Sequence, residues 1–140
     1  MALKKIGVVG AGTMGNGIAQ AFAQAGFDVV MSDVAQAALD RALATISGSY
    51  DRLIKKEKMT AEQKAAALAR IKTATELAAL KDADLIIEAA TENLDLKLKI
   101  FRQLDDLAKP DAVIASNTSS ISITKLAAST KRPDKVIGMH

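Results

Sequence analysis

A glycine-rich hexapeptide near the start of the chain constrains its fold more than any other feature: Gly10-Ala11-Gly12-Thr13-Met14-Gly15. An apolar run over 6–9 precedes it and is typical of a buried strand, and residues 18–23 follow with apolar side chains at helical spacing. Asp33 stands 18 residues after Gly15, at the end of a second apolar run over 29–31. Strand, glycine loop, helix, strand and terminal acid in this order predict a dinucleotide-binding unit.

Each position of this pattern has a physical role toward such a ligand. Gly10 permits a tight turn, Gly12 lets the backbone approach the pyrophosphate, and Gly15 lets the helix lie against the sheet. The pyrophosphate is expected at the helix N-terminus, where unpaired N–H groups and the helix dipole favour an anion. We therefore expect the cofactor to be bound by the loop and the acid after it: Gly10, Ala11, Gly12, Thr13, Met14, Gly15 and Asp33. The alternative is that the glycines serve only turns and packing.

Asp33 also bears on which dinucleotide is bound. Its carboxylate is expected to accept a hydrogen bond from an adenosine ribose hydroxyl. A 2′-phosphate at that place would face the carboxylate, and no Arg or Lys immediately follows Asp33 to offset it. The sequence thus favours NAD over NADP as the cofactor.

Composition excludes several other classes of protein. With 140 residues, 49% of them hydrophobic, the chain has the size of one domain, spanning 1–140. It has no cysteine and one histidine, which excludes a disulfide framework and a plausible zinc site. Four aromatic residues are too few for a base-stacking module, so no nucleic-acid partner is expected. Without a secretory leader or an apolar run of about 18 residues, we expect a cytoplasmic protein with no membrane partner.

Six apolar runs alternate with helical stretches along the chain: 6–9, 29–31, 71–74, 85–89, 113–115 and 136–138. Such alternation implies right-handed crossovers and a mostly parallel sheet that is covered by helices on both faces. The expected fold is α/β of the Rossmann type, a doubly wound, mostly parallel sheet of six or more strands. One helix, over 94–107, is expected to carry five large apolar residues on one face: Leu94, Leu98, Phe101, Leu104 and Leu107.

A long helical hairpin is expected between the second and third strands. Residues 35–56 are alanine-rich with large apolar residues at helical spacing, and a second helix starts at Thr60, where Gln63 completes a capping box. Over 41–72 there are eight Lys or Arg and three Asp or Glu, so the positive charge of the chain is concentrated here. This excess either serves an anionic ligand or solvates exposed helix faces.

Ligands of such sheets bind outside the carboxyl ends of the strands. Three segments should converge there: the glycine loop, the residues after Ala89, and the polar run over 116–120. That run, Ser-Asn-Thr-Ser-Ser, directly follows an apolar strand and is too rich in hydroxyl groups to be core. It is predicted either to contact the ligand or to form a plain strand-to-helix turn with capping residues.

Four motifs together resemble the NAD-binding domain of the 3-hydroxyacyl-CoA dehydrogenase family: the glycine-rich segment 10–20, Glu88-Ala-Ala-Thr-Glu92-Asn93, Ser116-Asn-Thr-Ser-Ser120 and Gly138-Met139-His140. The similarity covers essentially the whole chain and is greatest to bacterial enzymes that act on 3-hydroxybutyryl-CoA. It implies an NAD-dependent oxidoreductase of fatty-acid and butanoate metabolism, which interconverts (S)-3-hydroxyacyl-CoA and 3-ketoacyl-CoA.

The resemblance also implies roles for residues on the nicotinamide side of the cofactor. Glu92 and Lys97 match positions that contact the cofactor there. Asn117 and Ser119 match the loop beside the reacting centre, where the serine touches both the nicotinamide and the substrate.

For the substrate, the resemblance implies that Ser49 and Lys56 contact coenzyme A, which would give the basic helical hairpin a polyphosphate ligand. His140 matches the catalytic histidine, which would take the proton of the 3-hydroxyl as hydride leaves C3 for the nicotinamide ring. Histidine suits this role because its ordinary pKa of about 6.5 lies near working pH. Ser119 would hydrogen-bond the same oxygen.

Members of the family continue past this histidine for about another domain's length. The resemblance places there a carboxylate that orients the histidine, a substrate-binding asparagine, and a helical domain that makes a homodimer. We expect the chain without those parts to bind NAD weakly and to turn over little substrate, and His140 is alternatively a frayed terminal residue or a tag remnant. Two other functions stay open: a dehydrogenase of free 3-hydroxy acids that uses a lysine, and a non-catalytic nucleotide-binding module.

Overall fold

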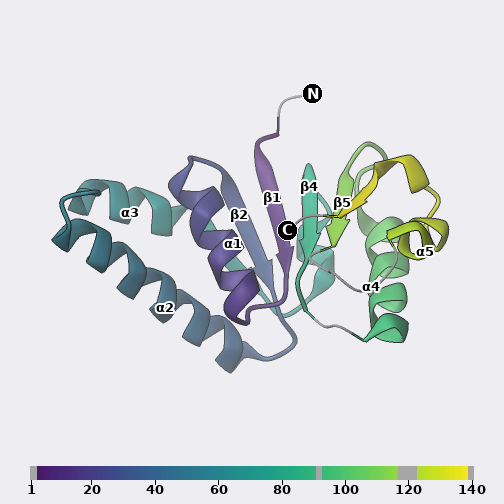
Figure 1. Ribbon diagram of the computed structural model, residues 1–140, viewed down its shortest axis with the longest axis horizontal. Helices are drawn as coiled ribbons and strands as arrows, with labels where there is room; N and C mark the ends of the chain where they lie inside the picture. The colour runs from purple at the N-terminus through teal and green to yellow at the C-terminus, as the bar shows by residue number, and fades with distance from the viewer. Residues whose placement is uncertain (1–2, 91–92, 117–122, 139–140) are drawn as a thin grey trace.

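The computed structural model describes residues 3–90, 93–116 and 123–138 of the chain. Strands and helices alternate along it (Figure 1) in the order β1 (Lys5–Val9), α1 (Thr13–Gln24), β2 (Asp28–Ser32), α2 (Gln36–Lys55), α3 (Ala61–Ala69), β3 (Ile71–Ala74), the 3₁₀ helix η1 (Leu77–Leu80), β4 (Leu85–Glu88), α4 (Leu94–Leu107), β5 (Val113–Ser116), α5 (Ile123–Ala128), the 3₁₀ helix η2 (Pro133–Lys135) and β6 (Val136–Gly138). The six apolar runs predicted as strands are these six strands, with each boundary within one residue.

The strands form one sheet in the order β3-β2-β1-β4-β5-β6, and all five neighbouring pairs are parallel. The arrowheads of β1, β2 and β4 point the same way in Figure 1. The chain runs outward from β1 through β2 to β3, then returns to the other side of β1 and continues through β4 to β6. The predicted Rossmann-type fold is confirmed, and its switch point lies between the carboxyl ends of β1 and β4.

Two apolar cores lie on the two faces of this sheet, as alternation of side chains along each strand requires. Val8 and Ile87 belong to the core that α1, α2 and α3 cover. Val9 and Ile86, their neighbours in sequence, belong to the core that η1, α4 and α5 cover. Figure 1 shows the two groups of helices on opposite sides of the strands.

Helices α2 and α3 follow one another between β2 and β3. The hydroxyl of Tyr50 on α2 is buried and donates a 2.7 Å hydrogen bond to the carbonyl of Gln20 on α1, and this burial raises the pKa of Tyr50. Helix α3 begins with the predicted capping box: the Thr60 side chain accepts from the N–H of Gln63, whose own side chain accepts from the N–H of Thr60. No helix in the described parts of the chain is both long and apolar enough to cross a bilayer.

Candidate dinucleotide-binding site

The glycine loop leaves β1 and enters α1 in a form that requires glycine. Gly10 has a φ of +104°, and a Cβ there would lie 2.9 Å from the backbone of Ala89 and Ala90. Its N–H donates a 2.7 Å hydrogen bond to the carbonyl of Ser32, so the loop is held to the end of β2. A Cβ on Gly15 would lie 1.8 Å from the carbonyl oxygen of Gly10. The close approach of helix and loop therefore depends on both residues.

Gly12 differs because nothing lies within 4 Å of the place where its Cβ would be. It is the N-cap residue of α1, and no side chain caps this helix, whereas Thr60 and Asn93 cap α3 and α4. The first turn of α1 contains no acidic residue. The start of α1 thus combines open space at Gly12 with a helix end that no side chain caps, which fits the pyrophosphate of a dinucleotide.

Asp33 lies directly after β2 and is half-buried beside the loop. One carboxylate oxygen accepts a 2.9 Å hydrogen bond from the N–H of Ala11, and the other accepts one of the same length from the N–H of Ala35. A carboxylate has about four lone-pair positions, so these two bonds leave room for a ribose hydroxyl. Sequence alone did not reveal the bond to Ala11, which fixes the acid relative to the glycine loop.

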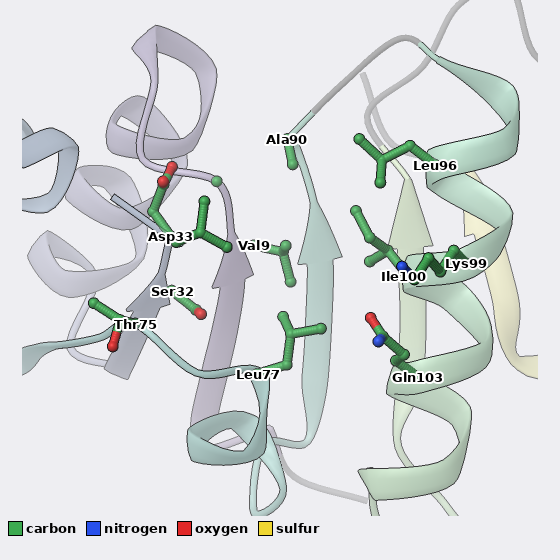
Figure 2. A pocket seen from close by; sticks show the side chains of 12 residues that line it. Val9, Ser32, Asp33, Thr75, Leu77, Ala90, Leu96, Lys99, Ile100 and Gln103 are labelled. Atoms are coloured by element: carbon green, nitrogen blue, oxygen red, sulfur yellow. The ribbon is translucent and has the colours of Figure 1, made fainter. Parts of the chain in front are cut away.

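A cavity of about 390 Å³ opens beside Asp33, and its lining residues come from three places. As Figure 2 shows, Asp33 and Thr75 lie on one side and Leu96, Lys99 and Gln103 of α4 lie on the other. Val9 at the end of β1 and Ala90, two residues after the end of β4, form its floor. Such a mostly apolar cleft with a few polar groups suits the adenosine half of the cofactor.

The side chains that α4 gives to this cavity were not predicted. The signals for them were Leu96 and Ile100, two large apolar residues outside the predicted face; Leu96 is 45% exposed in the structure and Ile100 is buried. The core face of α4 also differs in part from the predicted one. Phe101 and Leu104 are fully buried, the other three predicted residues are half-buried, and Lys97 and Asp105 are buried as well.

Lys97 is fully buried beneath the carboxyl ends of β4 and β5. Its ammonium lies 2.5 Å from Oε1 of Glu88 and 3.3 Å from Oγ of Ser116. The Ser116 hydroxyl donates a 3.0 Å hydrogen bond to the same Glu88 oxygen, and the N–H of Ala90 donates to the other oxygen at 2.8 Å. We call Glu88, Lys97 and Ser116 the buried network. Sequence reasoning identified neither Glu88 nor Ser116 as part of such a contact.

The remaining predicted residues of the nicotinamide side lie outside the described residues: Glu92, Asn117, Ser119 and His140. Three neighbouring strands end a few residues before them in the chain. Glu88 ends β4, Ser116 ends β5, and Gly138 ends β6, with Ser116 and Gly138 paired in register. The segments that carry the four predicted residues thus all start from the carboxyl edge of the sheet, on the far side of β1 from Asp33.

Ser49 and Lys56, predicted to contact coenzyme A, are not brought to the cavity. Ser49 is half-buried on α2 and accepts a 3.0 Å hydrogen bond from Arg52, while Lys56 is exposed at the C-cap. At about 1.5 Å of rise per residue, Ser49 lies roughly 20 Å along α2 from its start. Figure 1 shows that α2 runs away from the sheet toward the start of α3.

A parallel sheet, a glycine loop at a bare helix N-terminus, and an acid after the neighbouring strand together define a dinucleotide-binding domain. Residues 5–140 match the family described as 3-hydroxyacyl-CoA dehydrogenase, NAD binding domain, and the chain belongs to this family. The cofactor of this domain is NAD.

Relatives of known name agree with this assignment. The chain is 52% identical over 138 residues to 3-hydroxybutyryl-CoA dehydrogenase of Bradyrhizobium diazoefficiens, covering 99% of this chain and 47% of the relative. It is 48% identical over 136 residues to the protein of that name from Clostridioides difficile, covering 97% of this chain and 48% of the relative.

The crystal structure of (S)-3-hydroxybutyryl-CoA dehydrogenase PaaH1 from Ralstonia eutropha superposes with a TM-score of 0.96 at 59% identity. The match covers 99% of this chain and 49% of that one. The chain therefore spans about half the length of the relatives it matches.

Proposed function

We propose that this domain binds NAD for a protein that interconverts (S)-3-hydroxybutyryl-CoA and its 3-keto thioester. The observation that carries the NAD half of the proposal is the open N-terminus of α1 at Gly12 beside the carboxylate of Asp33. The substrate half is supported by the names of relatives at 48–59% identity. When bound, NAD supplies the hydride acceptor, and the chain supplies binding, orientation and a proton acceptor.

In this proposal the loop Gly10–Gly15, with Ala11, Gly12, Thr13 and Met14 between, holds the pyrophosphate, and Asp33 holds the adenosine ribose. Beyond the switch point Glu92, Lys97 and Asn117 serve the nicotinamide half. Ser119 and His140 serve the reacting oxygen, with the imidazole taking the hydroxyl proton. This division is supported by the strand order, which separates Asp33 from the ends of β4, β5 and β6.

For coenzyme A, the end of α2 and the turn after it offer an exposed cationic surface, which consists of Lys55, Lys56 and Lys58. Ser49 and Lys56 are proposed to meet its phosphates, because their part of α2 carries the excess of positive charge. An acyl-CoA partner, a homodimer made by a helical domain after residue 140, and a cytoplasmic location stay predictions.

The proposal is tested by calorimetric titration of the chain with NAD and with NADP, followed by acetoacetyl-CoA added to the NAD-loaded sample. We expect NAD to bind, NADP to bind at least about tenfold more weakly because of the Asp33 carboxylate, and the thioester to give heat. Equal binding of NAD and NADP would overturn the role of Asp33. In a protein that joins this chain to a second domain like that of its relatives, oxidation of free 3-hydroxybutyrate in preference to its thioester would favour a free-acid dehydrogenase, and NAD binding without turnover would favour a non-catalytic module.

A further inference from the structure

A second cavity lies at the amino edge of the sheet, away from the proposed NAD site. It has a volume of about 350 Å³, and its lining comes from the end of α1, the turn between α2 and α3, and α3 with the residue after it. Helices α1 and α3 are in contact, and Figure 1 shows α3 running back from the far end of α2 toward α1. Helix α1 is about 18 Å long at 1.5 Å per residue, so this cavity and Gly12 lie at its opposite ends.

The lining of this cavity carries positive charge only. Its ionised side chains are Lys58 and Arg70, its other polar side chains are Gln24 and Gln63, and the remaining residues are alanine, glycine or methionine. None of the described residues that line it is acidic. Lys58 is exposed, and within the described parts of the chain it forms no ion pair. A cavity in which every charge is cationic favours an anionic ligand.

Arg70 is half-buried and is held in place by the end of α1. Its Nη1 donates a 2.8 Å hydrogen bond to the carbonyl oxygen of Ala23, and its charge offsets the negative end of the α1 dipole. A guanidinium has five N–H groups. Among the residues that the structure describes, no acceptor contacts Nε or Nη2 of Arg70, and neither atom is buried. The contact with α1 thus fixes the guanidinium and leaves donors for a ligand.

Gln63 and Lys58 add two further donors at the start of α3. The side-chain oxygen of Gln63 accepts a 2.9 Å hydrogen bond from the N–H of Thr60 in the capping box, so its NH₂ group is available to donate elsewhere. Lys58 follows a sharp reversal of the chain, in which Glu57 has a φ of +59°. The N–H of Lys58 donates a 2.8 Å hydrogen bond to the carbonyl of Leu53, which fixes its backbone just before α3.

We infer that this cavity is a binding site for a phosphomonoester, with Arg70, Lys58 and the NH₂ group of Gln63 as its donors. A planar guanidinium can pair with two phosphate oxygens at once, and hydrogen bonds assisted by charge are about twice as strong as neutral ones. The buried side chain of Met59 and the neighbouring Ala66 give the cavity an apolar wall, which suits the organic part of such a ligand.

Two sources of the phosphomonoester share this chemistry. Lys58 also belongs to the surface proposed above for coenzyme A, whose ribose carries a 3′-phosphate, and a separate phosphorylated metabolite would offer the same group. The site itself does not depend on the proposed NAD or coenzyme A contacts, because Arg70 and Gln63 take part in neither.

The test uses inorganic phosphate as the probe and follows the amide resonances of the isotope-labelled chain by NMR, with chloride at the same ionic strength as the reference. We expect phosphate, and not chloride, to shift the resonances of the Gly26 N–H, the Arg70 Nε–H and the Gln63 side-chain NH₂. The N–H groups at the start of α1 report separately on phosphate bound at the proposed NAD site.

Gln63→Glu is the sharpest variant, because a glutamate at this position also completes a capping box and so preserves the start of α3. Its carboxylate replaces the NH₂ donor, and phosphate should bind at least about tenfold more weakly. Ala65→Glu is the matched control. It adds the same charge at an exposed position of α3 that does not line the cavity, and it should change the phosphate affinity by less than about twofold. Lys58→Gln should weaken phosphate binding by about threefold.

Competition with coenzyme A and with dephospho-coenzyme A, which lacks the 3′-phosphate, distinguishes the two sources. Displacement of phosphate by coenzyme A alone would assign the site to that 3′-phosphate, and displacement by neither would assign it to a separate phosphorylated molecule. Equal displacement by both would overturn the inference, because the pyrophosphate of coenzyme A would then occupy the cavity.

Three other results would also overturn it. Phosphate and chloride could shift the three resonances equally, phosphate could shift only the resonances at the start of α1, or Gln63→Glu and Ala65→Glu could bind phosphate alike. None of these results bears on the proposed NAD site, which calorimetric titration with NAD tests separately.

Discussion

At the scale of the residue, Asp33 combines two tasks in one carboxylate. It accepts hydrogen bonds from the N–H groups of Ala11 and Ala35, and it faces the cavity proposed for adenosine. Asp33→Ala should therefore weaken NAD binding by roughly 1.5–3 kcal/mol, which is the value of a hydrogen bond to a charged group. It should also reduce the difference between the affinities for NAD and NADP. Calorimetric titration with both cofactors measures this.

The two tasks can be separated with Asp33→Asn. The amide keeps one acceptor for a backbone N–H but removes the charge that repels a 2′-phosphate. We expect the ratio of NAD affinity to NADP affinity to be smaller in this variant than in the unmodified chain. We also expect its unfolding temperature to fall less than that of Asp33→Ala. Unchanged NAD affinity in Asp33→Ala would show that another residue holds the ribose.

At the scale of the element, α1 offers a comparison between two glycines that are equally unobstructed. Neither Gly12 nor Gly17 has an atom within 4 Å of an added Cβ, but Gly12 starts the helix at the proposed pyrophosphate and Gly17 lies within it. Gly12→Ala should weaken NAD binding, because the added methyl group would occupy the space proposed for the phosphates. Gly17→Ala should leave NAD affinity unchanged and stabilise the helix by about 0.5–1 kcal/mol.

Urea unfolding and calorimetric titration of the two variants check this pair. Gly15→Ala is a contrasting variant, because its Cβ would lie 1.8 Å from the Gly10 carbonyl oxygen. We expect it to lower the free energy of unfolding strongly. If Gly12→Ala bound NAD as well as Gly17→Ala does, the start of α1 would not be the pyrophosphate site.

Elements were also the scale at which the sequence was most informative. Apolar runs gave the six strands, and the Thr60–Gln63 pattern gave the start of α3, because both signals are local. The buried side of α4 was harder to predict. Lys97 and Asp105 are charged, so the sequence pattern predicts that they face solvent. Their burial is explained by ion pairs with residues distant in sequence, Glu88 and Arg132 respectively. The order of strands and the α4 side of the cavity likewise depend on contacts that no local pattern contains.

At the scale of the whole molecule, Asp84 ties the amino edge of the sheet together. Its carboxylate accepts from the N–H groups of Lys4 and Lys5 at 2.9 and 3.0 Å and pairs with Lys109. The hydrogen bond from Lys109, then those from the two backbone N–H groups, lower the pKa of Asp84 from 3.8 to about 2. A depression of this size corresponds to about 2 kcal/mol of folding stability.

The sign follows from the depressed pKa. The stabilisation is present above pH 3.8, is lost as the pH falls toward 2, and is absent below that. Asp84→Asn should therefore be less stable than the unmodified chain at neutral pH, and the difference should shrink in acid. Urea unfolding at several pH values measures it, with the exposed Asp28→Asn as control. A difference that stayed constant down to pH 2 would mean that the charge of Asp84 contributes nothing.

The central place of β1 has a consequence for how the chain is made. β1 precedes both of its neighbours in the chain, and its edge toward β4 has no partner until β4 emerges, beginning at Leu85. A nascent or interrupted chain that ends before β4 leaves β1, whose residues 6–9 are all buried in the folded sheet, with one bare edge, which is a template for pairing with another chain. Two nascent copies are thus at greatest risk of misassembly while α2, α3 and η1 are being translated.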